Sequence, residues 1–325
     1  MFELLSATWI AQSCYAVAKV GLPDLLSDGP RSVTELADLT GSDRRALGRV
    51  LRALSSAGVV AVTDEGEYQL TTVGELLRTG VTRSSRDAAV MFGEEVFRSF
   101  AEIGYTLRTG KPAFEKVYGA SFYAYLADNP EAASTFATAM GDGPVPVALA
   151  TCDLSGVRRI VDVGGGNGGL LAKVLRAEPQ ATGVLVELPS AIKQARERLC
   201  GAGLADRIEF AEGSFFGPIP GDADVYVLSR VLHNWDDAEA VSLLSGIRAA
   251  MPGGARLLIF ETLLGSANEE SSVIDLLILL MLPGSDRTLA EYADLLGQAG
   301  FEVKAVRSAP MKSRQSESVI EAVPR

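Results

Sequence analysis

The feature that most restricts the possible fold is a glycine-rich turn in the second half of the chain. Residues 161–169 read Val-Asp-Val-Gly-Gly-Gly-Asn-Gly-Gly and lie between a predicted strand at 160–163 and a predicted helix. Glycines at such a junction let the backbone approach a ligand closely, and the start of the helix leaves amide groups free to bind it. The turn therefore predicts a ligand site where a strand of an α/β sheet ends.

Strand and helix patterns alternate around this turn. We expect further strands at 184–187, 208–211, 223–229 and 256–261, and helices at 190–200 and from Asp236 to about residue 251. This alternation predicts a Rossmann-like, doubly wound α/β sheet. Two β-rich segments near the end of the chain, 301–307 and 318–323, are expected to form an antiparallel pair.

The first 85 residues have a different pattern, of short helices followed by a hairpin. Ser32 and Glu35 form a predicted capping box, and Ser42 precedes a second helix. Predicted strands at 59–63 and 68–71 then flank a turn that contains glycine. This order predicts a winged-helix-like domain, for which we weigh DNA binding against dimerisation. Residues 1–80 carry seven basic and ten acidic side chains, which disfavours DNA.

Residues 86–150 are expected to be a mostly helical linker that also contributes pocket helices. This stretch is rich in aromatic residues, which at helical spacing are core residues by default and also suit the wall of a pocket for a flat ligand. Prolines and glycines at 141–146 mark a break before the predicted α/β domain, 151–325. Three segments are therefore expected: a winged-helix-like domain at 1–85, a helical linker with pocket helices at 86–150, and an α/β ligand-binding domain at 151–325.

Composition excludes several other classes of protein. The chain has 30 basic and 41 acidic residues, a net charge of −11, which disfavours nucleic acid or an anionic membrane as a partner. Cys14, Cys152 and Cys200 are too few and too widely spaced for a disulfide framework, and with one histidine they predict no metal site. The longest apolar run, 276–282, is far shorter than the ~20 residues of a membrane helix. No basic residue precedes Leu4 and Leu5, so no secretory signal is evident and we expect a cytoplasmic protein.

Residues near the glycine turn indicate which cofactor it holds. Glu187 ends the next strand, 23 residues after Gly164, where a carboxylate can accept the hydroxyls of an adenosine ribose. Gly164, Gly166 and Gly169 also satisfy the dinucleotide fingerprint, so a nicotinamide cofactor is an alternative. Asp162 occupies a position that is usually apolar in dinucleotide sites, and its charge suits a cationic ligand. These features favour S-adenosylmethionine over NAD.

His233 is the only histidine in the chain, so an imidazole that acts as a base at neutral pH must be this one. It follows a predicted strand and lies at the same sheet edge as the glycine turn, although a histidine that only bonds a loop is the structural alternative. Glu261 ends the next strand and is expected to accept from the imidazole N–H. The alternative for Glu261 is an ordinary carboxylate at the end of a strand.

The sequence resembles the two-domain S-adenosylmethionine-dependent O-methyltransferases of the plant caffeate/hydroxyindole type, and in particular the bacterial members that tailor aromatic natural products such as antibiotics. The resemblance covers residues 1–325 and implies a homodimer formed through the N-terminal domain. Its specific motifs are the glycine turn 162–168, Glu-Gly-Ser-Phe-Phe at 212–216, Leu-His-Asn-Trp-Asp-Asp at 232–237, Pro-Gly-Gly at 252–254 and Asp-Arg-Thr at 286–288.

The resemblance also implies roles for individual residues. The residues expected to bind the cofactor are Asp162, Gly164, Gly165, Gly166, Glu187, Ser214, Phe215, Ser229 and Arg230. The expected catalytic residues are His233 as base and Glu261 and Asp286 as the acids that bracket it. The expected substrate-binding residues are Phe136, Met140, Trp235 and Asp275. The alternative for Asp275 is a carboxylate near the start of a helix that interacts favourably with the helix dipole.

Three positions depart from the family pattern: Ser214 replaces an aspartate, Asn234 replaces an aspartate, and Asp286 replaces the longer glutamate. The expected role of Asp286 as a bracketing acid therefore depends on whether its shorter side chain reaches the histidine. The resemblance implies methyl transfer from S-adenosylmethionine to a phenolic hydroxyl of a small aromatic acceptor without a metal, leaving S-adenosylhomocysteine. Transfer to carbon or nitrogen, an NAD(P)-dependent oxidoreductase and a winged-helix metabolite-sensing regulator are the alternatives.

Overall fold

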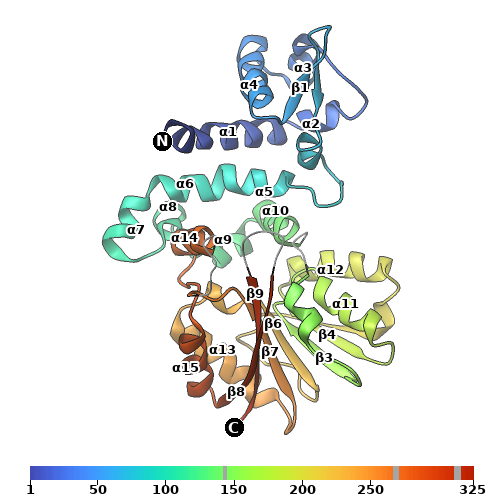
Figure 1. Ribbon diagram of the computed structural model, residues 1–325, viewed down its shortest axis with the longest axis vertical. Helices are drawn as coiled ribbons and strands as arrows, with labels where there is room; N and C mark the ends of the chain where they lie inside the picture. The colour runs from blue at the N-terminus through green and yellow to red at the C-terminus, as the bar shows by residue number, and fades with distance from the viewer. Residues whose placement is uncertain (142–144, 266–270, 311–315) are drawn as a thin grey trace. The chain divides into compact units, whose positions relative to one another are not determined.

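The computed structural model describes the chain except residues 142–144, 266–270 and 311–315. Its contacts divide it into two compact units (Figure 1). One unit contains residues 1–101 and most of helix α10 (Pro130–Gly141), and the other contains residues 102–130 and the chain from residue 145 onward. The predicted linker, 86–150, is therefore shared between the two units.

The first unit contains the predicted helix–helix–hairpin order. Its elements are α1 (Phe2–Lys19), α2 (Leu22–Leu25), α3 (Val33–Thr40), α4 (Arg44–Ser56), β1 (Val60–Val62), β2 (Tyr68–Leu70), η1 (Gly74–Leu77), α5 (Arg86–Met91), the π-helical η2 (Phe92–Val96) and α6 (Phe97–Ala101). The capping box of Ser32 and Glu35 is confirmed, and β1 and β2 pair antiparallel. The helix predicted after Ser42 is confirmed as α4, and the Asp43 side chain caps it by accepting from the Ala46 N–H.

The second unit is built on a seven-stranded sheet with the strand order β5-β4-β3-β6-β7-β9-β8. Its strands are β3 (Arg159–Val163), β4 (Thr182–Glu187), β5 (Ile208–Glu212), β6 (Val225–Ser229), β7 (Arg256–Glu261), β8 (Phe301–Pro310) and β9 (Ser316–Pro324). The first five strands pair in parallel, and β9 pairs antiparallel with β7 and β8. The predicted Rossmann-like sheet and its C-terminal antiparallel pair are confirmed.

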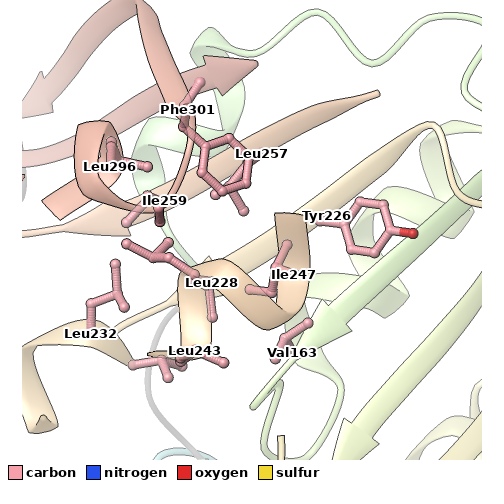
Figure 2. Packing of buried hydrophobic residues seen from close by; sticks show 14 of the residues in the cluster. Val163, Tyr226, Leu228, Leu232, Leu243, Ile247, Leu257, Ile259, Leu296 and Phe301 are labelled. Atoms are coloured by element: carbon pink, nitrogen blue, oxygen red, sulfur yellow. The ribbon is translucent and has the colours of Figure 1, made fainter. Parts of the chain in front are cut away.

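Helices cover both faces of this sheet. Helices α11 (Gly169–Ala177) and α12 (Pro189–Gly201) lie on one face, and α13 (Asp237–Ala250) and α15 (Leu289–Gln298) lie on the other (Figure 1). Alternate residues of each strand face the two layers, as in β3, where Val161 and Val163 join the α13 layer and Ile160 joins the α11 layer. Figure 2 shows part of the α13 layer, with Leu243 and Ile247 packed among strand residues.

The remaining elements of the second unit are α7 (Ile103–Thr109), α8 (Ala113–Tyr118), α9 (Phe122–Asp128), η3 (Val147–Thr151), η4 (Ala205–Arg207), η5 (Leu232–Asn234) and α14 (Ser271–Met281). Because β3, β4, β6 and β7 are parallel, their carboxyl ends meet at one edge of the sheet. The glycine turn, Glu187, η5 and Glu261 follow or end these strands. Among the described residues, no helix has the length and apolar character needed to cross a membrane.

Candidate active site

The glycine turn brings its backbone close to the neighbouring strand ends. Gly164 has φ +71°, and a Cβ atom added there would lie 2.9 Å from Cγ2 of Val231 and 3.3 Å from Cε1 of Phe215. The N–H of Gly166 donates to Oε2 of Glu187 at 3.1 Å, and the N–H of Leu188 donates to Oε1 at 2.7 Å. The structure therefore places Glu187 directly against the turn, and each of its oxygens keeps a lone pair for a further donor.

Asp162 lies beneath the turn and is fully buried. Neither of its carboxylate oxygens has a hydrogen-bond partner among the described residues. A Cβ atom on Gly165 would lie 2.4 Å from Cγ of Asp162, so the absence of a side chain at Gly165 is what leaves room for this carboxylate. Burial and, to a smaller extent, the charge of Glu187 raise the pKa of Asp162 to about 7. An unpartnered carboxylate in such a place suits a cationic ligand group.

Aromatic rings gather on the other side of Gly164. The Phe215 ring lies against Gly164 and meets the Trp235 ring edge-on at 5.8 Å. Trp235 stacks on Tyr123 of α9, with ring centroids 5.2 Å apart and an interplanar angle of 16°. Ser214 is exposed, and its Oγ accepts from the N–H of Phe216. The predicted adenine-binding and substrate-binding residues Phe215 and Trp235 are therefore in contact with each other.

Ser229 ends β6, and Arg230 follows it at the same edge. Arg230 has φ +56°, an uncommon conformation for a residue with a side chain. Its Nη2 lies 2.7 Å from Oε1 of the buried Glu317 in β9, whose other oxygen accepts from the N–H of Ala148. This ion pair fixes the end of β6, which leads into η5 and His233.

His233 is held by two buried acids. Its side chain is 14% exposed, and its Nδ1 lies 3.3 Å from Oδ1 of Asp286 and 3.4 Å from Oε2 of Glu261. Oε1 of Glu261 accepts from the backbone N–H of Leu232 at 3.0 Å and of His233 at 3.4 Å. The two acids therefore have different roles. Asp286 contacts the imidazole ring, whereas Glu261 contacts the ring and also accepts hydrogen bonds from the backbone of η5.

The electrostatics of this group favour a histidine that can hold a proton. Burial lowers the pKa of His233, but the charge of Glu261 and the hydrogen bond and charge of Asp286 outweigh burial and raise this pKa above its ordinary value. Burial raises the pKa of Glu261, which the nearby His233 opposes. A base with such partners becomes a stabilised imidazolium when it takes a proton.

Two residues that the sequence analysis did not assign hold the histidine loop in place. Arg287 is buried, and its guanidinium donates to the carbonyl oxygens of Leu232 at 3.1 Å and Trp235 at 2.7 Å. Gly284 packs so closely that an added Cβ atom would lie 2.2 Å from the carbonyl oxygen of His233. The Asp-Arg-Thr motif was the one sequence signal for Arg287, and it carried no information about which loop the arginine binds.

The four predicted substrate-binding residues lie in different places. Trp235 joins the aromatic cluster, whereas Phe136 and Met140 belong to α10 in the first unit. Asp275 lies in α14, and its Oδ1 accepts from the backbone N–H of Asp286 at 2.8 Å. The helix-dipole alternative for Asp275 was wrong, because this residue lies in the second turn of α14 and already has that partner. Acceptor contacts at all four positions stay predictions.

The chain matches known proteins along its whole length. Residues 100–302 match the O-methyltransferase domain, and residues 2–80 match the O-methyltransferase dimerisation domain. The phenazine O-methyltransferase PhzM of Lysobacter antibioticus is 37% identical over 100% of this chain and 95% of that protein. The 8-amino-8-demethylriboflavin N,N-dimethyltransferase of Streptomyces davaonensis is 40% identical over 92% of this chain and 89% of that protein.

A solved structure shows the same similarity in three dimensions. The O-methyltransferase NcsB1 from neocarzinostatin biosynthesis, crystallised with S-adenosylmethionine and 2-hydroxy-5-methyl naphthoic acid, has a TM-score of 0.83 and 32% identity, covering 97% of this chain and 96% of that one. The chain therefore belongs to the S-adenosylmethionine-dependent O-methyltransferase family.

Family membership decides among the predictions made from the sequence. It confirms an S-adenosylmethionine-dependent O-methyltransferase in place of the NAD(P)-dependent oxidoreductase alternative. The dimerisation domain confirms the predicted homodimer. Among the described residues, no group of three or more His, Cys, Asp or Glu side chains is arranged to hold a metal ion.

Proposed function

We propose that this enzyme transfers the methyl group of S-adenosylmethionine to a phenolic hydroxyl of a small aromatic acceptor, with His233 as general base. The observation that carries the proposal is the geometry at His233, whose Nδ1 lies between the buried acids Asp286 and Glu261. Because the ring directs Nδ1–H toward these carboxylates, Nε2 is the nitrogen that accepts a proton.

The residues around the glycine turn fit the cofactor, which supplies a methyl group on a cationic sulfonium sulfur. Asp162 offers an unpartnered buried carboxylate to the positive charge of the methionine part. The backbone of Gly164, Gly165 and Gly166 is proposed to bind the cofactor directly, and Glu187 keeps lone pairs for the ribose. The remaining residues that we propose for cofactor binding are Ser214, Phe215, Ser229 and Arg230.

Proton removal is the chemical task left to the side chains. A phenol has a pKa of about 10 and is mostly protonated at neutral pH. His233 takes this proton at Nε2 as the phenolic oxygen attacks, and Asp286 and Glu261 stabilise the imidazolium that forms. General base assistance of this kind contributes ~10²–10⁴-fold. Correct alignment of the oxygen with the methyl group contributes as well.

The acceptor is proposed to be flat and aromatic. Trp235, Tyr123 and Phe215 present stacked and edge-on rings at this site, and such rings favour aromatic guests. Phe136, Met140 and Asp275 remain proposed contacts to the acceptor. The relatives' names point the same way, to a phenazine and a naphthoic acid. We retain a small molecule rather than nucleic acid as partner because of the net charge of −11.

Transfer to nitrogen is the second candidate, because the riboflavin relative, at 40% identity, is an N,N-dimethyltransferase. The two candidates are separated by incubating the enzyme with labelled S-adenosylmethionine and matched pairs of naphthols and naphthylamines, hydroxyphenazines and aminophenazines. Mass spectrometry then locates the new methyl group. Methylation of the hydroxy compounds supports the proposal, and methylation confined to the amines overturns it.

A further inference from the structure

Asp275 is connected to His233 through a single intervening residue. Its Oδ1 accepts from the backbone N–H of Asp286 at 2.8 Å, and the side chain of Asp286 in turn lies 3.3 Å from Nδ1 of His233. Asp275 belongs to α14, which packs against α7 and α8 in the second unit. The carboxylate therefore links this helix to the backbone of the acid that orients the histidine.

The segment 284–287, which contains Asp286, is fixed on both sides of that residue. Gly284 presses against the carbonyl oxygen of His233, and the guanidinium of Arg287 donates to the carbonyl oxygens of Leu232 and Trp235. The backbone carbonyl of Arg287 also accepts from the N–H of Leu264 at 3.0 Å. Between these anchors, the side chain of Asp275 holds the backbone N–H of Asp286, the residue whose carboxylate contacts the imidazole.

We propose that Asp275 is a positioning residue that holds Asp286 against the Nδ1 atom of His233 and thereby couples α14 to the orientation of the base. This role rests on the proposed function in one respect, namely that His233 is the base. It requires an oxygen that accepts a hydrogen bond at position 275 and does not require contact between Asp275 and the acceptor.

The charged groups around the imidazole determine how loss of the bond between Asp275 and Asp286 would change the pKa of His233. His233 faces Glu261 of β7, Asp286 of the segment 284–287 and Arg230 at the end of β6, and Tyr292 of α15 lies near both acids. The two acids raise the pKa of His233, whereas burial and Arg230 lower it. Displacement of Asp286 removes one of the two raising groups, so this pKa should fall.

The test measures the histidine directly. Because the chain contains one histidine, a protein enriched in isotope-labelled histidine gives a single imidazole signal by NMR, and its titration reports the pKa of His233. The variants are Asp275→Ala, which removes the acceptor oxygen, and Asp275→Asn, which keeps an acceptor oxygen and removes the charge. Asp294→Ala removes an exposed carboxylate of α15 as a control. Turnover, KM for the acceptor and S-adenosylhomocysteine affinity are measured on the same proteins.

The proposal expects Asp275→Ala to lower the pKa of His233 by about one unit and kcat by about 10–100-fold, with unchanged S-adenosylhomocysteine affinity. Asp275→Asn should keep the pKa of His233 near the wild-type value, because it retains an acceptor oxygen, whereas Asp294→Ala should leave both this pKa and kcat unchanged. If Asp275→Ala does not fold, Asp275→Glu, which shifts the carboxylate by one methylene, must lower the pKa instead.

Two results would overturn this role. An unchanged histidine titration in Asp275→Ala, or in Asp275→Glu if it is used, removes the link to His233. A rise in acceptor KM in both Asp275→Asn and Asp275→Ala, with normal titration, means that the carboxylate binds the acceptor instead. Full activity of a His233→Ala enzyme would remove the proposed base but leave the effect of Asp275 on the titration intact, so the two failures are distinguishable.

Discussion

Oδ1 of Asp286 lies 3.3 Å from Nδ1 of His233, and Oε2 of Glu261 lies 3.4 Å from the same atom, so Nδ1 is the ring nitrogen that faces both acids. Asp286 is one methylene shorter than the glutamate usual in the family, yet it reaches the ring. The segment that carries Asp286 packs against the histidine loop through Gly284 and Arg287. This close packing brings the shorter side chain within contact distance of the imidazole. Nε2 is therefore the atom that takes the acceptor's proton in the proposed mechanism.

The pH dependence of the reaction should report the pKa of His233. The base must be neutral, so kcat/KM should rise with pH through this pKa and level off above it. Since Glu261 and Asp286 raise the pKa, the midpoint should lie above the ordinary value of about 6.5. A profile measured with a phenol that stays protonated throughout checks this. A midpoint below 6, or a flat profile, would contradict it.

Replacement of Asp286 by asparagine should shift that midpoint. The amide retains the shape of the side chain but removes the negative charge, so the pKa of His233 should fall by about 1 unit or more. The imidazolium also loses a stabilising partner, so the plateau rate should drop by roughly tenfold. The pH–rate profile of Asp286→Asn checks both effects, with Asp294→Asn as an exposed control. A midpoint that does not move would mean that Asp286 does not stabilise the charged ring.

Cofactor affinity should depend on pH through Asp162. Its pKa of about 7 means that it is half protonated near neutrality, and a bound cationic group lowers that pKa. Binding should therefore release a proton, and S-adenosylhomocysteine affinity should increase by roughly tenfold between about pH 6 and about pH 8. Calorimetry in buffers of different ionisation enthalpy measures the proton release. The Asp162→Asn enzyme should bind S-adenosylhomocysteine more weakly, and its affinity should not change with pH in this range. If the pH dependence is retained, the released proton comes from another group.

Gly284 should tolerate no side chain. A Cβ atom there would lie 2.2 Å from the carbonyl oxygen of His233 and 2.5 Å from the backbone nitrogen of Trp235, and backbone atoms cannot rotate away, so Gly284→Ala must push the two segments apart. We expect a loss of about 1–3 kcal/mol in the free energy of unfolding and about 100-fold in kcat. Gly253→Ala is the matched control, because nothing lies within 4 Å of its added Cβ. Equal behaviour of the two variants in denaturant unfolding and turnover would contradict the close packing.

The sequence predicted those parts of the site that depend on the order of strands. The glycine turn, Glu187, His233 and Glu261 all end or follow parallel strands, and the carboxyl ends of such strands necessarily share one edge. The single histidine then left one choice for the base.

The contacts that cross between distant segments were not predictable in this way. Arg287 binds carbonyl groups more than 50 residues earlier, and Asp275 binds the backbone of Asp286 from a separate helix. Neither contact follows from periodicity or spacing, because both depend on how α14 and the following segment pack. Glu261 was expected to accept from the imidazole N–H, and its bonds to the backbone N–H groups of Leu232 and His233 were not predicted.

The measurement that tests the central claim most directly compares wild-type and His233→Ala enzymes across phenols of graded acidity. A base is needed only while the phenol keeps its proton. With ordinary phenols of pKa about 10, the variant should be ~10²–10⁴-fold slower, and the deficit should shrink toward nothing for phenols already ionised at the assay pH. S-adenosylhomocysteine affinity should be the same in both enzymes. A deficit that is independent of phenol pKa, or no deficit at all, would contradict the assignment of His233 as the base.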